Sequence, residues 1–343
     1  MTDAAPPPVR LLYAPYDSGA FDVRMGAGPL ALRRGGAARW LRERGHEVDE
    51  QVLEPTSPWR AEVQTAFELQ RVVAAAVADA RRAGRLPLLL AGNCNTTLGV
   101  LAGLAQPGRR FGLVWLDAHA DFTTPETTTT GFLDGQGLAM VVGRCWRTLT
   151  STVGHFGPLP EHQVLLVGAR DVGTAEGTDL RASGVRWLPP ATARDADTTA
   201  AARDDLAARV DAVHVHVDLD VHDPVAVAPA NGYAAADGLL AAEVQRVVRQ
   251  TADRLPVVSA TLAAYDPGHD EAGRMRETAL ALLGRLAAVA TRPCEASARS
   301  RKPSSSDLPL PTTTTLRAGG AICIASILTP PTVLACGKIG LAP

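Results

Sequence analysis

FGLVWLDAHAD, residues 111–121, gives the clearest indication of the fold of this chain. It opens with an apolar run whose length and composition are typical of a buried strand. It ends in Asp117, His119 and Asp121, which an extended backbone places on one side of the strand end. Acidic and imidazole groups crowded at a buried position need a countercharge, so the stretch predicts a divalent metal site. A solvated acidic loop is the alternative.

A second stretch, HVHVDLDVHDP at residues 214–224, repeats this arrangement. Its alternating apolar residues indicate a strand, and Asp218 and Asp220 stand at the strand end. Two strands that end in carboxylates pointing the same way can hold two hard cations side by side. Carboxylate and imidazole ligands without a thiolate pair favour Mn²⁺, Mg²⁺ or Ca²⁺ over a structural zinc ion. An Asp-Pro turn at 223–224 is the alternative, but it does not explain the two carboxylates inside the apolar run.

Strand and helix patterns alternate along most of the chain. The predicted strands are residues 9–13, 88–90, 111–116, 163–167, 213–217 and 257–262. The predicted helices are residues 30–44, 59–83, 239–252 and 275–289. This alternation predicts an α/β fold with a mostly parallel sheet that helices cover on both faces. In such folds ligands bind beyond the carboxyl ends of the strands, where both acidic stretches end.

The composition fits one large domain followed by a tail. With 343 residues, 46% of them hydrophobic, the chain can bury a large core, which we place in residues 1–292. Residues 293–343 are rich in Ser, Thr and Pro, which is typical of a disordered tail. The formal net charge is −2 and no basic run stands out, so neither nucleic acid nor a membrane is expected as a partner.

The cysteines and the N-terminus favour a cytoplasmic protein. Five cysteines are an odd number, and they lack the CxxC spacing of zinc sites. This usage favours a reducing compartment over a disulfide framework. The first residues show no signal-peptide pattern, and no stretch reaches the apolar length of a membrane span.

The two acidic stretches together resemble a known family. Asp-Ala-His-Xaa-Asp at 117–121 and Asp-Xaa-Asp-Xaa-Xaa-Asp-Pro at 218–224 are similar to motifs of the ureohydrolases, which include arginase and agmatinase. The resemblance covers roughly residues 8–291. It implies a three-layer αβα arginase-like fold, a homotrimer or hexamer, and two Mn²⁺ ions that share a hydroxide. That hydroxide would attack a linear guanidino or amidine carbon and release urea or a urea derivative.

The resemblance also implies a set of metal ligands. They are Cys94, Asp117, His119, Asp121, Asp218 and Asp220. Asp117 and Asp218 would bridge the ions, and His119 and Asp220 would complete the second site. Cys94 stands where the family has a histidine ligand of the first ion, and a thiolate matches Mn²⁺ poorly, so we expect that ion to be weakly held. A small buried cysteine without a ligand role is the alternative.

Catalytic and substrate-binding roles follow from the same resemblance. Asp121 would complete the first site and hydrogen-bond the hydroxide. Asp134 takes the place of an arginase histidine that is thought to shuttle protons; it would act as an acid, grip a cationic substrate, or be a turn aspartate before Gly135. The implied substrate-binding residues are Thr123, Thr130, Glu176 and Asp266. Asp266 is included as a substitute for Ala264, which stands where the family has a glutamate that pairs with the guanidinium.

The identity of the substrate stays open. Gly173 and Ala264 stand where arginases have acidic contacts to the substrate, which argues against plain L-arginine. A branch of the family that acts on hydroxylated arginine fits the altered ligand at Cys94. A formiminoglutamate-type amidine hydrolase is one alternative, and a metal-poor pseudoenzyme that binds a ligand or partner is another.

Two histidines of the second stretch need a separate explanation. His214 and His216 have the same parity as Asp218, so they face the same side of the predicted strand. His216 stands where arginases have a small residue. It is either a partner or substitute for the metal ligands, or a core histidine with its hydrogen bonds satisfied.

Overall fold

Eight parallel strands form the centre of the structure, a computed structural model that describes residues 6–58 and 61–290. Every neighbouring pair in this sheet is parallel, and the strand order is β4-β1-β5-β10-β9-β6-β7-β8. The strands are β1 (Val9–Ala14), β4 (Val48–Val52), β5 (Leu86–Ala91), β6 (Phe111–Leu116), β7 (Val164–Val167), β8 (Arg186–Leu188), β9 (Ala212–Asp218) and β10 (Val257–Ala263). A short hairpin is formed by β2 (Tyr16–Asp17) and β3 (Ala20–Phe21).

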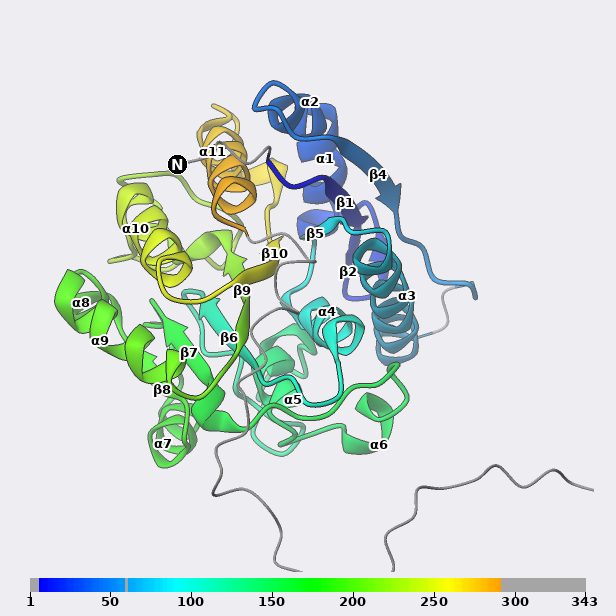
Figure 1. Ribbon diagram of the computed structural model, residues 1–343. Coiled ribbons are helices and arrows are strands. Elements are labelled where there is room, and N and C mark those ends of the chain that lie inside the picture. Colours follow the sequence, from blue (N-terminus) through cyan, green and yellow to red (C-terminus); the bar gives the residue numbers. More distant parts are fainter. Residues whose placement is uncertain (1–5, 59–60, 291–343) are drawn as a thin grey trace, which may run out of the picture. The chain divides into compact units, whose positions relative to one another are not determined.

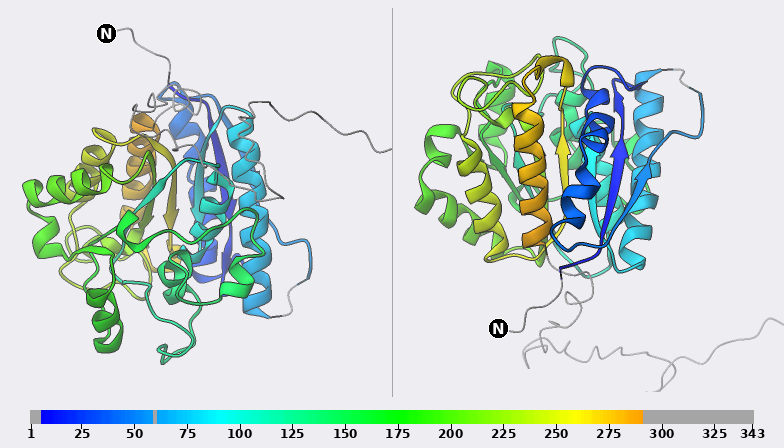
Figure 2. Two further views of the ribbon diagram at one scale, coloured as in Figure 1. Left: turned by 60° about the horizontal axis from the view of Figure 1, so that its bottom comes forward. Right: turned by 90° about the horizontal axis from the view of Figure 1, so that it is seen from above.

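Helices cover both faces of this sheet (Figures 1 and 2). One layer holds α1 (Gly28–Arg34), α2 (Ala37–Arg42), α8 (Pro190–Ala193), α9 (Ala196–Ala207), α10 (Ala241–Ala252) and α11 (Arg274–Val289). The other holds α3 (Glu62–Arg82), α4 (Thr97–Leu104), α5 (Gly137–Val141), α6 (Arg147–Thr150) and α7 (Thr174–Ala182). The predicted three-layer α/β architecture is therefore confirmed.

The core is divided by the sheet into two apolar clusters, one under each helix layer. Strand β1 shows why, because its side chains alternate between the two faces. Leu11 and Tyr13 belong to the cluster under α2 and α11, while Leu12 and Ala14 belong to the cluster under α3. Near-continuous apolar strands are what a parallel sheet buried on both faces requires.

The strands at the two edges of the sheet were not predicted. The β4 sequence, VDEQV, is half polar and partly exposed, and β8 is only three residues long, so neither has the apolar run of a buried strand. The predicted helix over residues 30–44 is wrong as a single element. It is two helices, α1 and α2, separated at Gly35 and Gly36, and Gly36 has φ +91°, which a helix cannot contain.

The strand order creates a crevice at the carboxyl edge of the sheet. Strands β5 and β6 follow one another in the chain, yet β10 and β9 lie between them in the sheet. The segments that leave β5, β6 and β9 all begin at this edge of the sheet. A ligand in this class of fold usually binds there, where the order of the strands changes direction.

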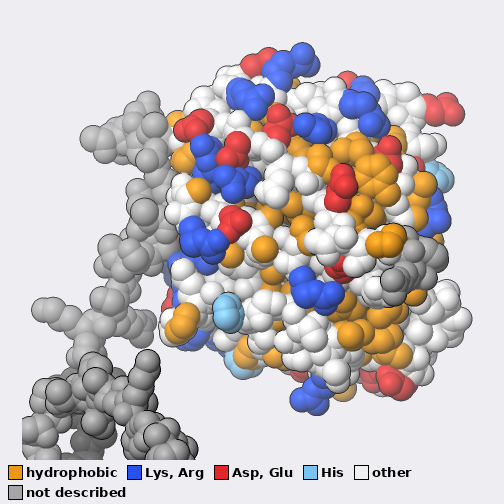
Figure 3. Space-filling model, turned by 90° about the vertical axis from the view of Figure 1, so that its right-hand side faces the viewer, with side chains coloured by type: hydrophobic (Ala, Val, Ile, Leu, Met, Phe, Trp, Pro, Cys, Tyr) orange, Lys and Arg blue, Asp and Glu red, His pale blue; other side chains and the backbone are white. Residues whose placement is uncertain are grey.

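Charges of both signs are interspersed on the face shown in Figure 3, with apolar side chains exposed between them. The face carries no continuous basic area that would attract nucleic acid. Within residues 6–58 and 61–290, no helix combines the length and the apolar character that crossing a membrane requires.

Gly92, directly after β5, allows the backbone of Tyr16 and Gly26 to pack closely against this loop, and its replacement tests this packing. A Cβ there would lie 2.2 Å from the Tyr16 carbonyl oxygen and 2.7 Å from the Gly26 Cα. We expect Gly92→Ala to lower the free energy of unfolding by about 3 kcal/mol, because backbone rather than a flexible side chain would have to move. Chemical denaturation would measure this change.

The matched control is Gly157→Ala, where a methyl group would meet no atom of the described residues within 4 Å. This variant should stay within about 0.5 kcal/mol of the parent protein. Equal stability of the two variants would contradict the tight contact at Gly92.

Candidate metal centre

The turn after β6 gathers three predicted ligands. Asp117 is buried, and its two carboxylate oxygens accept hydrogen bonds from the Trp115 indole (Nε1, 2.9 Å) and the His119 backbone N–H (2.7 Å). The His119 Nδ1 lies 3.4 Å from the Asp117 Oδ1. Asp121 is also buried and has φ +49°, a left-handed conformation that Asp tolerates better than most residues. The local backbone thus aims all three polar groups at the crevice.

The end of β9 supplies the other two carboxylates. Asp218 and Asp220 are both buried, and the Asp218 Oδ1 accepts a hydrogen bond from the Asp220 N–H at 2.8 Å. The Asp220 Oδ2 lies 3.3 Å from the His119 Nδ1. Asp117, His119 and Asp220 therefore present three ligand atoms within 4.8 Å of one another. This oxygen and nitrogen set fits a hard or borderline divalent cation.

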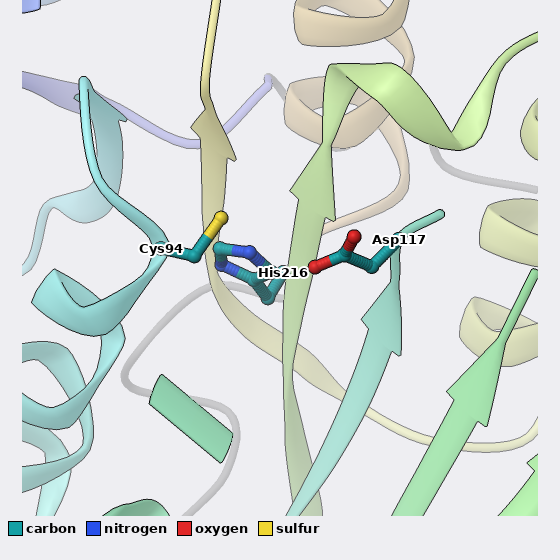
Figure 4. Close-up of side chains that lie close together, drawn as sticks. All are labelled: Cys94, Asp117 and His216. Carbon is teal, nitrogen blue, oxygen red and sulfur yellow. The ribbon is translucent and has the colours of Figure 1, made fainter. Parts of the chain in front are cut away.

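Cys94 reaches the same place from the loop after β5. It begins the short 3₁₀ helix η2 (Cys94–Thr96), is almost fully buried, and donates its thiol to the Asp218 Oδ2 at 3.0 Å. Cys94, Asp117 and His216 form a second group whose ligand atoms lie within 4.8 Å of one another. Figure 4 shows the His216 imidazole between the other two side chains. The structure therefore brings Cys94 beside Asp117 and Asp218, two of the predicted ligands.

The two β9 histidines differ in how their ring nitrogens are used. The His214 nitrogens lie 2.7 Å from the Ser259 hydroxyl and 3.2 Å from that of Thr261, so His214 is a satisfied core histidine. The His216 Nδ1 pairs with the Thr97 hydroxyl at 2.8 Å, and its ring stacks on Trp115 with centroids 3.9 Å apart. Its Nε2 is buried and has no hydrogen-bond partner in the described part of the chain.

Burial and mutual repulsion dominate the electrostatics of the centre. Burial raises the pKa of Asp117, Asp121 and Asp218, the last two well above their ordinary range, and neighbouring carboxylates add to the effect. Burial also opposes the charge on Asp220, but the facing imidazolium of His119 lowers the pKa of Asp220 to about 2. Although burial disfavours its charge, His119 has a raised pKa because Asp220 and Asp117 lie beside it.

Asp134 holds the loop that carries Cys94. Its carboxylate accepts hydrogen bonds from the backbone N–H groups of Cys94 (3.0 Å) and Asn95 (2.8 Å) and from the Asn93 amide (3.0 Å). Burial raises the pKa of Asp134 to about 7, while these donors act in the opposite direction. The side chain also lines the cavity described next, so the structure brings it to the site and ties it to the loop at once.

A cavity of about 450 Å³ opens above the centre. Its acidic lining residues are Asp121, Asp134, Asp171, Glu176, Asp218 and Asp220. Among the described residues that line it, His119 is the only basic one. Cys94 and Asp117 do not line this cavity, and both are almost completely buried. An acid-rich cavity of this size attracts small cationic molecules.

Three of the four predicted substrate-binding residues line the cavity, namely Thr123, Thr130 and Glu176. The Glu176 carboxylate accepts a hydrogen bond from the Phe122 N–H at 2.8 Å. Asp266 does not line the cavity. Its carboxylate instead accepts the Gly268 N–H at 2.9 Å, so it caps a short 3₁₀ helix, η6 (Pro267–His269).

Sequence reasoning did not single out every residue that lines the cavity. Asn231 and Tyr233 are two that it missed. The Asn231 amide donates to the Asp220 Oδ2 (3.3 Å) and to the Ala264 carbonyl (2.9 Å), which links the end of β9 to that of β10. The Tyr233 ring stacks on Phe132 at the cavity, with centroids 5.7 Å apart. Both lie in an irregular loop, and no periodic pattern marks such positions.

Comparisons with known proteins agree with this geometry. Residues 8–288 match the arginase family. An arginase of Bacillus caldovelox is 28% identical over 292 residues, which cover 81% of this chain and 97% of the relative. The N(omega)-hydroxy-L-arginine amidinohydrolase of Streptomyces lavendulae is 32% identical over 214 residues, 61% of this chain and 73% of the relative. The native structure of Bacillus caldovelox arginase has a TM-score of 0.75 at 26% identity and covers 82% of this chain and 98% of its own.

The fold, the buried ligand cluster and the acid-lined cavity define the class as a hydrolase of C–N bonds in guanidino or amidine compounds. The chain belongs to the arginase family, as the motif resemblance predicted. This family depends on a binuclear metal centre, and the donor atoms described above fit one. The buried, mutually repelling carboxylates have the form that a pair of divalent cations would stabilise.

The raised pKa values predict a pH-dependent response to metal. Asp121, Asp134 and Asp218 hold protons more tightly in the folded protein, so the metal-free protein should lose stability as pH rises from about 4 through neutrality. Since each proton that a cation must displace costs about 1.4 kcal/mol per pH unit, we expect Mn²⁺ to raise the melting temperature more at pH 8.5 than at pH 6.5.

Thermal unfolding with chelator or with Mn²⁺ at the two pH values would measure the difference. Burial lowers the pKa of His214 to about 3, so its contribution changes only below about pH 6.5 and does not enter this comparison. An equal or larger shift at pH 6.5 would contradict the assignment of raised pKa values to the metal-binding carboxylates.

Proposed function

We propose that this chain is a Mn²⁺-dependent hydrolase of a linear guanidino amino acid, and that it prefers Nω-hydroxy-L-arginine to L-arginine. The observation that carries the proposal is the acid-lined cavity directly above the cluster of Asp117, His119 and Asp220. Attack of water on the guanidino carbon breaks one C–N bond, which releases hydroxyurea from the hydroxylated substrate and urea from arginine. The amine that leaves takes the proton that completes it.

The metal-binding residues form two unequal halves. Asp117, His119 and Asp220 would hold one ion through oxygen and nitrogen atoms. Cys94 and Asp218, whose Sγ and Oδ2 atoms lie 3.0 Å apart, would hold the other ion together with Asp121. Divalent ions held there would supply Lewis-acid activation of water and stabilise negative charge in the transition state.

The protein's own groups orient the reacting molecules. Asp121 lines the cavity, and in this proposal it accepts a hydrogen bond from the attacking water. Asp117 and Asp218 are almost fully buried, which limits the access of bulk water to these ligands and so strengthens their electrostatic effect. The Asp134 carboxylate keeps the Cys94 loop in place through its three hydrogen bonds.

The preference for a hydroxylated guanidine rests on the acids that the chain lacks near the reacting group. Ala264 is buried and contributes only its carbonyl oxygen, which is bonded to Asn231. A hydroxyguanidine is less basic than a guanidine, because oxygen withdraws electrons, so it depends less on a paired carboxylate. The similarity to a Streptomyces N(omega)-hydroxy-L-arginine amidinohydrolase supports the same choice. Asp171 and Glu176 remain at the cavity to face the ammonium group of the amino acid.

Turnover by the purified full-length chain tests the proposal. The panel would hold hydroxyarginine, arginine, agmatine, guanidinobutyrate and formiminoglutamate, each with and without Mn²⁺, with detection of hydroxyurea, urea and the other released products. We expect Mn²⁺-dependent turnover with the highest kcat/KM for hydroxyarginine. Asp220→Ala should lower kcat/KM by at least about a hundredfold, because the variant lacks one of the three side chains that would hold this ion.

The control is Asp266→Ala, which changes a carboxylate outside the cavity and should leave kcat/KM within about twofold of the parent value. Turnover of formiminoglutamate alone would replace the proposed substrate by the other amidine. No turnover on the whole panel, together with unchanged metal binding in Asp220→Ala, would favour a protein that only binds a ligand or partner.

Asp134→Asn separates positioning from proton transfer. Because one carboxylate holds three donors, we expect the variant to need at least about tenfold more Mn²⁺ for half-maximal activity and to lose about 1–3 kcal/mol of stability. Its kcat at saturating Mn²⁺ should fall less than tenfold. A large fall in kcat with an unchanged Mn²⁺ requirement would instead make Asp134 the proton donor.

A further inference from the structure

We propose that the His216 Nε2 is a ligand of the first metal, and that with the Cys94 thiolate it makes this half of the centre a site for a softer ion such as Zn²⁺. The inference rests on the proposed function only for the location of the metal centre. Its readout is metal binding, which does not require turnover.

An unused, buried nitrogen is the first observation. The His216 side chain has no solvent exposure, and its Nδ1 pairs with the Thr97 hydroxyl. Its Nε2 has no hydrogen-bond partner among the residues described. Native proteins seldom bury a polar atom without a partner, so such an atom needs an explanation. A metal ligand is typically held in this way, with one ring nitrogen fixed by a hydrogen bond and the other free to bind.

The surroundings of the His216 ring are the second observation. Ligand atoms of Cys94, Asp117 and His216 lie within 4.8 Å of one another (Figure 4). The Cys94 Sγ lies a further 3.0 Å from the Asp218 Oδ2, so a fourth donor is adjacent. Sulfur, nitrogen and two oxygens are a donor set that suits Zn²⁺ and Co²⁺ better than Mn²⁺. Binding would release the thiol proton, as at other thiolate sites.

The fold explains how the His216 imidazole can compensate for the histidine ligand that Cys94 replaces. The loop after β5 brings Cys94 to a position where the family resemblance implies a histidine. Strand β9, which β10 separates from β5 in the sheet, brings the His216 imidazole. Trp115 stacks on the His216 ring and donates to the Asp117 carboxylate, so a single side chain orients two of the proposed ligands. The two halves of the centre then differ in chemistry, since the Asp117, His119 and Asp220 group contains no sulfur.

Cobalt absorption spectroscopy of the full-length, metal-stripped protein tests this assignment. In the parent protein we expect a thiolate-to-cobalt charge-transfer band together with the intense visible bands of a four-coordinate ion. His216→Ala should lower the affinity of this site for Co²⁺ by at least about tenfold. His214→Ala is the matched control, because it truncates a buried histidine on the same face of β9 whose two nitrogens are already satisfied.

The spectra distinguish the outcomes. A parent protein without the thiolate band would overturn the proposal, and so would a His216→Ala variant whose spectrum and affinity match those of the control. Circular dichroism would establish that both variants fold.

If His216→Ala does not fold, X-ray absorption of zinc-loaded His119→Ala provides the decisive measurement. That variant lacks the histidine of the other half of the centre. Imidazole scattering at zinc would then support His216 as a ligand, and its absence would overturn the assignment. If this test supports His216 as a ligand but the protein hydrolyses none of the amidines, the proposed function would be rejected and the metal site retained.

Discussion

Four carboxylates are buried side by side at the centre, and the cost of charging them shapes the rest of the site. Asp117, Asp121, Asp218 and Asp220 lie at the ends of two neighbouring strands, where burial limits screening by water. Removing such groups from water is costly unless positive charge or hydrogen bonds compensate. The surrounding features, from the Trp115 indole to the Asp220 N–H, each place a donor against one of these oxygens. These donors compensate part of the cost, and divalent cations would compensate the rest.

Sheet topology determines which parts of the chain take part in that solution. Strands β6 and β9 are about a hundred residues apart in sequence and pair in parallel, with Leu116 opposite Val217, so their acidic ends coincide. The loop after β5 reaches them from across β10. Asp134 joins this loop to the segment after β6, and Asn231 joins the end of β9 to that of β10. The centre is thus assembled from segments that the sheet order alone brings together.

The sequence predicted the parts of this arrangement that follow from regular periodicity. The acidic residues after β6 and β9 repeat with the period of two of an extended strand, which marks both the strands and the shared direction of their side chains. Cys94 and Asp134 were found only through the family resemblance, because no local pattern marks a loop residue as a neighbour of a distant strand. Parity placed His216 on the correct face, but the unused nitrogen became visible only with the packing of Thr97 and Trp115 around it.

The structural elements that the sequence did not predict are mostly those without a regular apolar pattern. Edge strands β4 and β8 have neighbours on one side only, so they need no continuous apolar run and resemble loops in their composition. The cavity rim, including Asp171 and Tyr233, belongs to irregular segments whose conformation depends on tertiary contacts. A helix pattern interrupted by Gly35 and Gly36 kept its apolar spacing and concealed the break.

The burial of Cys94 also bears on the chemical durability of the protein. Oxidants and alkylating reagents attack exposed thiolates. The Cys94 sulfur is almost inaccessible, and burial together with Asp218 raises its thiol pKa. Burial likewise raises the pKa of Cys145 to about 12. We therefore expect the Cys94 sulfur to react slowly with peroxide, and its alkylation would report that the loop after β5 had opened.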